Sequence, residues 1–269
     1  MNDHDGTQSI TFFKYLPFNE GSLNVLREGT WKYTHPARFN DPFDCSPVLD
    51  PLSAASFVRK RPEIFAAAAK HKGYSPAKRI EHKQRMLKKL EQAVASGEFN
   101  RGLVEGIGVC CFTLNPTNLL MWSHYAQQHQ GFVVEFRLDL TTTPAPIAFH
   151  HFPMPVVYSV DRPILQLGDE SAEAECYRTK SVDWSYEEEL RSLRQVGDGT
   201  IQPYSREHLL VSVVAGCRMD PSDGKALIEA ARKASLDIGR DVPVYDAQLS
   251  QTKYKVLIPK HPNPLFSED

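Results

Sequence analysis

Two glutamates one residue apart, Glu187 and Glu189, precede Arg191 in the second half of the chain. If this segment is extended, the three side chains project to one face, whereas a helix would align Trp184, Glu188 and Arg191 instead. A carboxylate held beside a guanidinium could stabilise a positive charge that develops during a reaction. The ordinary alternative is a solvated helix start, where acidic residues favour the helix dipole. Both glutamates are therefore candidate catalytic residues.

Aromatic and histidine side chains gather in a second segment, 118–128, which we expect to be a helix capped by Asn118. A helix would place Trp122 and Tyr125 on one side. His124 and the later His129 would lie about 140° apart around it, so they could not easily share a metal ion. Aromatic side chains on one side of a helix are typical of core packing. Trp122, His124 and Tyr125 could also form a wall for a planar ring such as adenine or nicotinamide.

A rigid turn is expected at Phe39–Asp44, where Asn and Asp residues precede a proline. Short polar side chains in such a turn bond to nearby backbone N–H groups, which is the ordinary role for Asn40. The same turn could present Asp41 or Asp44 at the rim of a site. Two carboxylates could also hold a hard cation such as magnesium, although the usual supporting ligands are not evident.

The composition is that of a globular protein and excludes several classes. The chain has 269 residues, a formal net charge of −2 and 41% hydrophobic residues. It has no apolar run of the roughly 18–20 residues that a membrane helix needs. Its five cysteines form no Cys-x-x-Cys pair, which argues against a disulfide scaffold or a zinc ribbon. The polar, acidic start is unlike a secretion signal, so we expect a cytoplasmic protein with no membrane partner.

Positive charge is concentrated between Arg59 and Glu91, where eleven Lys or Arg and three Glu give a local net charge of +8. Ser75-Pro76 is a typical helix start, and an earlier helix is expected near 62–70. We therefore expect a basic helical hairpin inserted at 51–100. This hairpin could bind nucleic acid or an acidic protein, and a solvated Lys-rich helix face is the ordinary alternative.

Short strands and a few helices follow one another without regular β-α-β repetition outside the hairpin. This favours an α+β fold, with a mixed or antiparallel sheet and flanking helices, over a doubly wound sheet. We expect a single domain over 11–260 that carries the insertion, with tails at 1–10 and 261–269. The expected strands are 11–16, 31–34, 109–113, 132–136, 155–158, 209–215, 242–245 and 254–258, and the expected helices are 21–27, 118–128 and 221–236.

Four ordered segments of the chain resemble those of a large, mostly bacterial family of domains of unknown function. The resemblance covers residues from about 11 to 260, and the family name does not imply a function. The segments are an early strand with Lys14-Tyr15, the turn Phe39–Asp44, Met121–Tyr125 with His129-Gln130-Gly131, and Trp184–Arg191.

A more distant similarity, at the level of the fold, is to ADP-ribosyltransferase-like proteins, which include bacterial toxins and phage-defence effectors. Those proteins carry a polar residue on an early strand and a catalytic Glu, often in a Glu-x-Glu pair, on a late strand of a split sheet. The similarity implies NAD as the substrate and Glu187 or Glu189 as the carboxylate that stabilises an oxocarbenium-like ribose. It also implies Arg191 or Lys14 at the pyrophosphate, although such enzymes use His or Arg where this chain has Lys14.

Two other classes of function stay open beside an ADP-ribosyltransferase or NAD glycohydrolase. A metal-dependent nuclease would use Asp41, Asp44 and Glu187, and a non-catalytic binding module would use the basic hairpin. For the NAD-using enzyme we expect one cleft and no metal ligand. The cleft would hold Glu187 or Glu189 with Lys14, Tyr15, Asn40, Trp122, His124 and Arg191, and Asp41 and Tyr125 are further candidate cofactor-binding residues.

Overall fold

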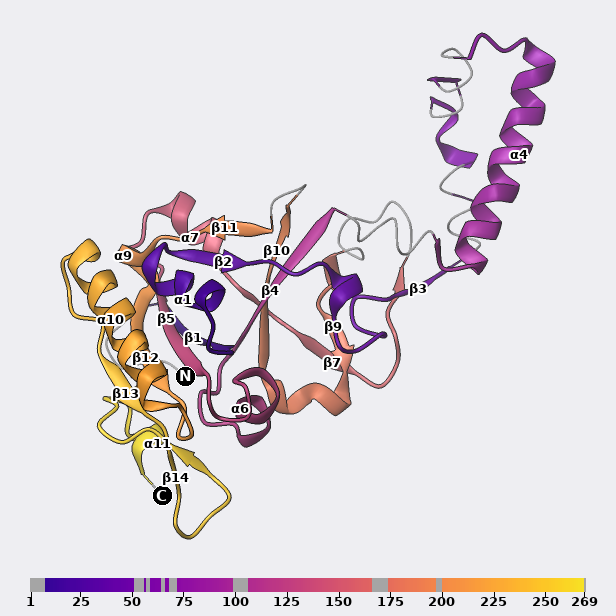
Figure 1. The fold of residues 1–269 in the computed structure, drawn as a ribbon. Coiled ribbons are helices and arrows are strands. Elements are labelled where there is room, and N and C mark those ends of the chain that lie inside the picture. The colour runs from indigo at the N-terminus through magenta and orange to yellow at the C-terminus, as the bar shows by residue number, and fades with distance from the viewer. Residues whose placement is uncertain are drawn as a thin grey trace. The chain divides into compact units, whose positions relative to one another are not determined.

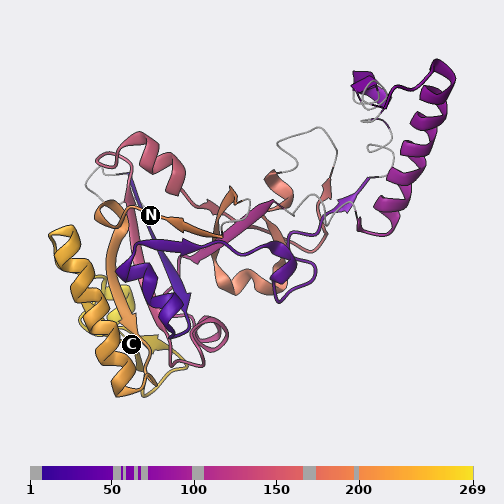
Figure 2. The ribbon, with the colours of Figure 1, turned by 45° about the horizontal axis from the view of Figure 1, so that its top comes forward.

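The protein was analysed as a computed structural model, which describes residues 8–50, 56, 59–63, 66–67, 72–98, 106–165, 174–196 and 200–268. The chain divides into two compact units. Figures 1 and 2 show the ribbon from two directions. The first unit comprises Met1–Tyr33, Val109–Val156 and Asp183–Asp269, and the second comprises Thr34–Gly108 and Val157–Val182.

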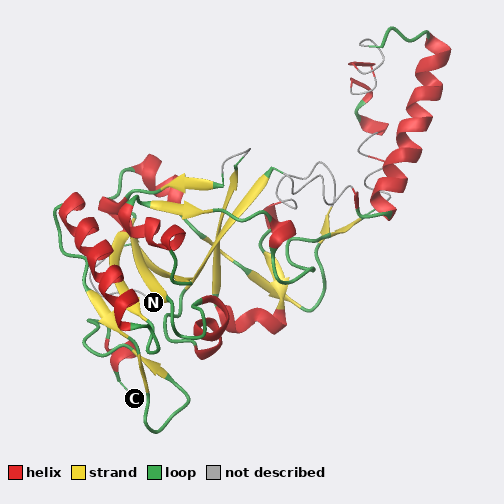
Figure 3. Ribbon diagram, in the orientation of Figure 1, coloured by secondary structure: helices red, strands yellow, loops and turns green. Residues whose placement is uncertain are grey.

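A mixed sheet is the centre of the first unit (Figure 3). Within the described residues it has seven strands in the order β13-β12-β5-β1-β4-β10-β6. β1 (Ser9–Leu16) pairs antiparallel with β5 (Phe132–Asp139) along its whole length and with β4 (Ile107–Thr113) on its other side. β12 and β13 pair in parallel, and the predicted α+β class is confirmed. The other strands are β6 (Met154–Pro155), β10 (Glu189–Gln195), β12 (Leu210–Ala215) and β13 (Val244–Asp246).

The two faces of this sheet carry separate apolar clusters, because successive strand residues point to opposite sides. On one face, which we name the α1 face, Phe12 packs with residues of the helices α1 (Glu20–Arg27) and α10 (Pro221–Ile238). On the other, which we name the α6 face, Phe13 and Tyr15 pack with residues of α6 (Leu119–Tyr125). The side on which a β1 residue projects therefore decides which helices it contacts.

Helices α1 and α10 each begin at a polar capping residue. Asn19 Oδ1 accepts a hydrogen bond from the Ser22 backbone N–H at 2.8 Å where α1 begins, and Asp220 caps α10 in the same manner. These bonds satisfy amide groups that have no partner within the helix. None of the helices in the described ranges is both long and apolar enough to cross a membrane.

Helix α6 ends at Tyr125, earlier than the end near residue 128 that the sequence predicted. The next residues explain the difference, because positions 127–129 have φ values of 49°, 51° and 70°, in the left-handed region. The chain then turns back to the sheet through Gly131. A Cβ atom there would lie 2.2 Å from the Leu16 carbonyl oxygen, so only glycine fits without displacing β1.

Shorter elements complete the first unit. β2 (Thr30–Lys32) pairs with β11 (Ile201–Pro203), and β14 (Gln248–Leu249) pairs with β15 (Val256–Leu257). The segment after residue 260, expected to be a tail, packs on the sheet: His261 Nε2 lies 3.3 Å from Glu135 Oε2. The remaining short helices are α7 (Ala145–His151), α9 (Arg206–Leu209) and α11 (Pro264–Ser267).

The second unit contains the long helix α4 (Pro76–Ala95), whose predicted start is confirmed because Ser75 Oγ accepts a hydrogen bond from the Lys78 backbone N–H. Most of the expected partner helix near 62–70 lies outside the described residues. None of the α4 side chains that the structure describes is buried. This unit also contains the 3-10 helix η1 (Pro36–Arg38) and two parallel strand pairs, β3 (Val48–Leu49) with β8 (Ile164–Leu165) and β7 (Val157–Ser159) with β9 (Thr179–Ser181).

Candidate functional site

Asn118 connects the two sequence segments that carry most of the candidate residues. Its Oδ1 caps α6 by accepting hydrogen bonds from the backbone N–H groups of Leu120 (2.9 Å) and Met121 (3.1 Å). Its Nδ2 donates to the carbonyl oxygen of Tyr186 at 2.7 Å. One amide side chain therefore starts the helix and also holds the residue before Glu187 beside it.

The Glu187 carboxylate accepts a hydrogen bond from the Tyr125 hydroxyl at 2.7 Å. Glu187 is the last residue of the 3-10 helix η2 (Val182–Glu187) and is 3% exposed, whereas Tyr125 is half-buried. The Glu187 carbonyl oxygen accepts a second hydrogen bond from Thr113 Oγ1 of β4 at 2.5 Å. Because a helix holds the side chain and a strand holds the backbone, the carboxylate has a defined position.

A residue in the left-handed region separates the two candidate glutamates. Glu188 has a φ of 44°, which is uncommon for a residue with a side chain. Its carboxylate accepts a hydrogen bond from Asn115 Nδ2 at 2.9 Å. The chain thus passes from η2 into β10 between Glu187 and Glu189, and the segment is neither one strand nor one helix. The Asn115 carbonyl oxygen also accepts a hydrogen bond from the Tyr15 hydroxyl at 3.0 Å.

Glu189 and Arg191 form a bidentate ion pair at the start of β10. Arg191 Nε donates to Glu189 Oε1 at 2.7 Å and Nη2 donates to Oε2 at 3.1 Å, and both side chains are almost completely buried. Leu190 between them belongs to the cluster of the α1 face, so the pair projects to the α6 face. Burial and the nearby Glu189 carboxylate raise the pKa of the Cys111 thiol well above its usual value, which disfavours its thiolate form.

Lys14 lies on the opposite face of the sheet from these glutamates. Since it precedes Tyr15 on β1, the two side chains project to opposite sides. The Lys14 ammonium lies 5.2 Å from the centroid of the Phe112 ring on the α1 face and donates to the Cys111 carbonyl oxygen at 2.9 Å. Tyr15 is on the α6 face, where burial raises the pKa of its phenol well above the usual value. Of the two adjacent candidates, Tyr15 shares a face with Glu189.

Trp122 is fully buried and packs in the core of the α6 face. Its Nε1 donates to the Pro116 carbonyl oxygen at 2.9 Å. Its ring meets Tyr15 edge-on at 5.3 Å and stacks on His129 at 6.0 Å. His124, in contrast, is exposed. Trp122 therefore belongs to the core, whereas the His124 ring is accessible.

Asn40 and Asp41 belong to the second unit. Asp41 Oδ1 accepts a hydrogen bond from the Phe43 backbone N–H at 2.8 Å, which confirms the predicted turn in which a side chain bonds to the backbone. Asn40 is exposed, and the buried Asp44 carboxylate lies 3.6 Å from Lys180 Nζ. In the part of the chain that the structure describes, no group of three or more His, Cys, Asp or Glu side chains could hold a metal ion.

Several residues of the site were missed by sequence reasoning. Thr113 and Asn115 hold the backbone of Glu187 and the side chain of Glu188, and Asn118 holds Tyr186. They are single polar residues outside any recurring spacing, and only the capping role of Asn118 was visible in the sequence.

A protein-family model matches part of the chain. Residues 121–192 match the family model described as a protein of unknown function, DUF2971. The matched segment contains both residues of the Tyr125–Glu187 hydrogen bond and both residues of the Glu189–Arg191 pair. No curated protein and no solved structure matches the chain. The match supports a relationship of residues 121–192 to an uncharacterised domain family.

Proposed function

We propose that this protein cleaves the bond between nicotinamide and ribose in NAD, either as an ADP-ribosyltransferase or as an NAD glycohydrolase, with Glu187 as the catalytic carboxylate. The observation that carries the proposal is the 2.7 Å hydrogen bond from Tyr125, which fixes the nearly buried Glu187 carboxylate. The Glu187 carboxylate lies beside helix α6, on which Tyr125 is half-buried and His124 is exposed.

The reaction explains why a carboxylate in a fixed position is useful. As nicotinamide departs, the ribose takes on oxocarbenium character and a positive charge develops on it. A carboxylate oriented before the reaction stabilises this charge without the cost of reorganisation. Water or an acceptor group then attacks the ribose carbon and loses its proton. Trp184 and Tyr186, whose rings lie 6.1 Å apart just before Glu187, supply ring surfaces of the kind that contact nicotinamide or adenine.

Glu189 is assigned a positioning role in this proposal. Both of its carboxylate oxygens accept hydrogen bonds from Arg191, so its negative charge is already compensated by a guanidinium. Glu187 is placed at the reacting carbon because the Tyr125 hydroxyl orients its carboxylate. The Glu189–Arg191 pair is assigned the role of holding the beginning of β10.

The test is the release of nicotinamide from NAD by the purified protein and by the variants Glu187→Gln, Tyr125→Phe and Glu188→Gln. We expect Glu187→Gln to lower the rate about 10²–10³-fold and Tyr125→Phe to lower it about tenfold, because a hydrogen bond to a charged group contributes about 1.5 kcal/mol. Glu188→Gln is the matched control, since Glu188 is exposed and its Asn115 partner can still donate to an amide oxygen.

Addition of cell lysate distinguishes the two enzyme types. Release that requires lysate indicates transfer of ADP-ribose to a macromolecule, and release without it indicates hydrolysis. If neither condition yields nicotinamide and NAD does not bind, the proposal is refuted. If release is equally fast in Glu187→Gln, the assignment of Glu187 is refuted.

A second candidate function is binding of nucleic acid or of an acidic protein by α4. The exposed residues of this helix include five basic side chains, Lys78, Arg79, Arg85, Lys88 and Lys89. A basic solvated helix attracts polyanions, and binding of this kind weakens steeply with salt. Titration of a labelled oligonucleotide at low and high salt tests it. Binding that persists unchanged in Glu187→Gln would support a site independent of the proposed NAD chemistry.

A further inference from the structure

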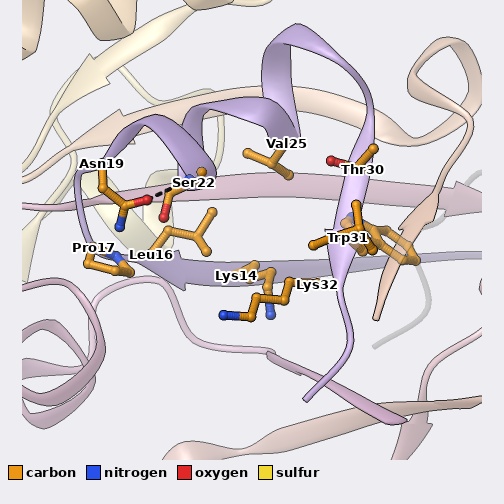
Figure 4. Close-up of a pocket in the computed structure, with 11 residues that line it drawn as sticks. Lys14, Leu16, Pro17, Asn19, Ser22, Val25, Thr30, Trp31 and Lys32 are labelled. Atoms are coloured by element: carbon orange, nitrogen blue, oxygen red, sulfur yellow. Dashed lines mark hydrogen bonds between the residues drawn. The ribbon is translucent and has the colours of Figure 1, made fainter. Parts of the chain in front are cut away.

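A cavity of about 350 Å³ lies in the first unit between β1, α1 and β2 (Figure 4). It is on the α1 face of the sheet, where Lys14 projects, so it is separate from the Glu187 carboxylate beside α6. Its volume is at the lower end of the range of about 300–1,000 Å³ typical of small-molecule sites. The NAD proposal makes no use of this cavity.

The charge of the lining is positive. Lys14 from β1 and Lys32 from β2 both line the cavity, and its lining includes no Asp or Glu. Figure 4 shows the two lysine side chains next to each other in this view. Lys14 is held at the wall by its hydrogen bond to the Cys111 carbonyl oxygen and by the Phe112 ring, whereas Lys32 is exposed. Two ammonium groups without a lining carboxylate favour an anionic occupant.

The rest of the lining combines apolar surface with a few polar groups. Leu16, Val25 and Trp31 supply apolar walls, and Ser22 and Thr30 contribute hydroxyl groups. Trp31 is 1% exposed, so its ring is fixed in the core at the cavity wall. A site with cations and apolar walls suits an amphiphilic anion.

We propose that this cavity binds a small organic anion, with a phosphate or carboxylate group at Lys14 and Lys32 and a ring-sized apolar body against Leu16, Val25 and Trp31. The negative group is recognised by the two ammonium groups, and the apolar body gains from leaving water. Neither a bare inorganic ion nor a neutral apolar molecule uses both parts of the lining.

The test uses ligand-observed NMR titrations of the full chain with phenyl phosphate, benzoate and inorganic phosphate at constant ionic strength. Lys32→Glu reverses a charge at the cavity, and because Lys32 is exposed its replacement leaves the core intact. Lys253→Glu is the matched control, since Lys253 is exposed, makes the same change in net charge and is not part of the lining. We expect Lys32→Glu to weaken binding of the organic anion at least about tenfold, and Lys253→Glu to leave it within about twofold.

The three probes decide the chemistry of the occupant. Selective binding of phenyl phosphate supports a phosphate ester, selective binding of benzoate supports a carboxylate, and binding of both supports recognition of either group. The proposal is overturned if neither organic probe binds at millimolar concentration, or if Lys32→Glu binds as well as Lys253→Glu. It is also overturned if inorganic phosphate binds as tightly as phenyl phosphate, because the apolar walls would then contribute nothing.

Discussion

Replacement of Arg191 by methionine tests whether the buried ion pair of β10 holds the sheet together. Arg191 and Glu189 are 0% and 2% exposed at their side chains and are joined by two hydrogen bonds. Removal of one partner of a buried pair leaves a charge without compensation, which typically costs about 3–5 kcal/mol. For a chain of this size a loss of 1 kcal/mol lowers the melting temperature by roughly 2–4 °C. We therefore expect Arg191→Met to melt roughly 6–20 °C below the wild type.

Calorimetry and urea unfolding would measure this loss beside two further variants. Glu189→Gln/Arg191→Met removes the uncompensated charge, so we expect it to recover at least about 1 kcal/mol relative to the single variant. Arg27→Met is a matched surface control, because its 2.6 Å ion pair with Glu20 has exposed fractions of 28% and 83%. Such a pair contributes at most about 1 kcal/mol. If Arg191→Met is no less stable than Arg27→Met, or if the double variant recovers nothing, the reasoning is refuted.

Four further predictions concern two glycines, the cap of α6 and His129. Gly131→Ala should destabilise the protein by about 1–3 kcal/mol in urea unfolding, because its Cβ would meet the Leu16 carbonyl oxygen at 2.2 Å. Gly224→Ala, in α10 with its nearest atom at 4.0 Å, should instead stabilise it by about 0.4–1 kcal/mol. Asn118→Ala should cost about 1–2 kcal/mol in the same assay, since it removes a helix cap, and equal stability would contradict the capping role. Burial lowers the pKa of His129 below 6.5. Its contribution to stability is therefore present above pH 6.5 and is lost as the pH falls through its folded pKa. We expect His129→Asn to flatten the pH dependence of the melting temperature below pH 6.5, and an unchanged profile would contradict the assignment to His129.

The site depends on side chains that hold other side chains. Tyr125 and Thr113 both bond to Glu187, and Asn118 bonds to the carbonyl oxygen just before it. A substitution at any of these three positions would change the position of the carboxylate without removing it. Under the proposed function, we therefore expect these variants to release nicotinamide more slowly than the wild type but faster than Glu187→Gln.

Local sequence was sufficient to predict most of the elements. The capping residues Asn118 and Ser75 and the irregular order of strands and helices led to the α+β class and to correct starts for α6 and α4. These features depend on residues within one turn or one strand, where backbone sterics and side-chain capping act. The expectation of one cleft with both Lys14 and Tyr15 left strand alternation out of account, since adjacent residues of a strand project to opposite faces.

Long-range contacts were needed for the rest. Whether the segment around Glu187 would be strand or helix could not be decided locally, because Thr113 and Asn115, more than seventy residues earlier, hold Glu187 and Glu188 at the junction of η2 and β10. Likewise, α6 could have continued past Tyr125 on local propensity. The close approach of Gly131 to Leu16 belongs to the pairing of β5 with β1. Such contacts form only when distant strands pair, so the position of the Glu187 carboxylate is a property of the folded sheet.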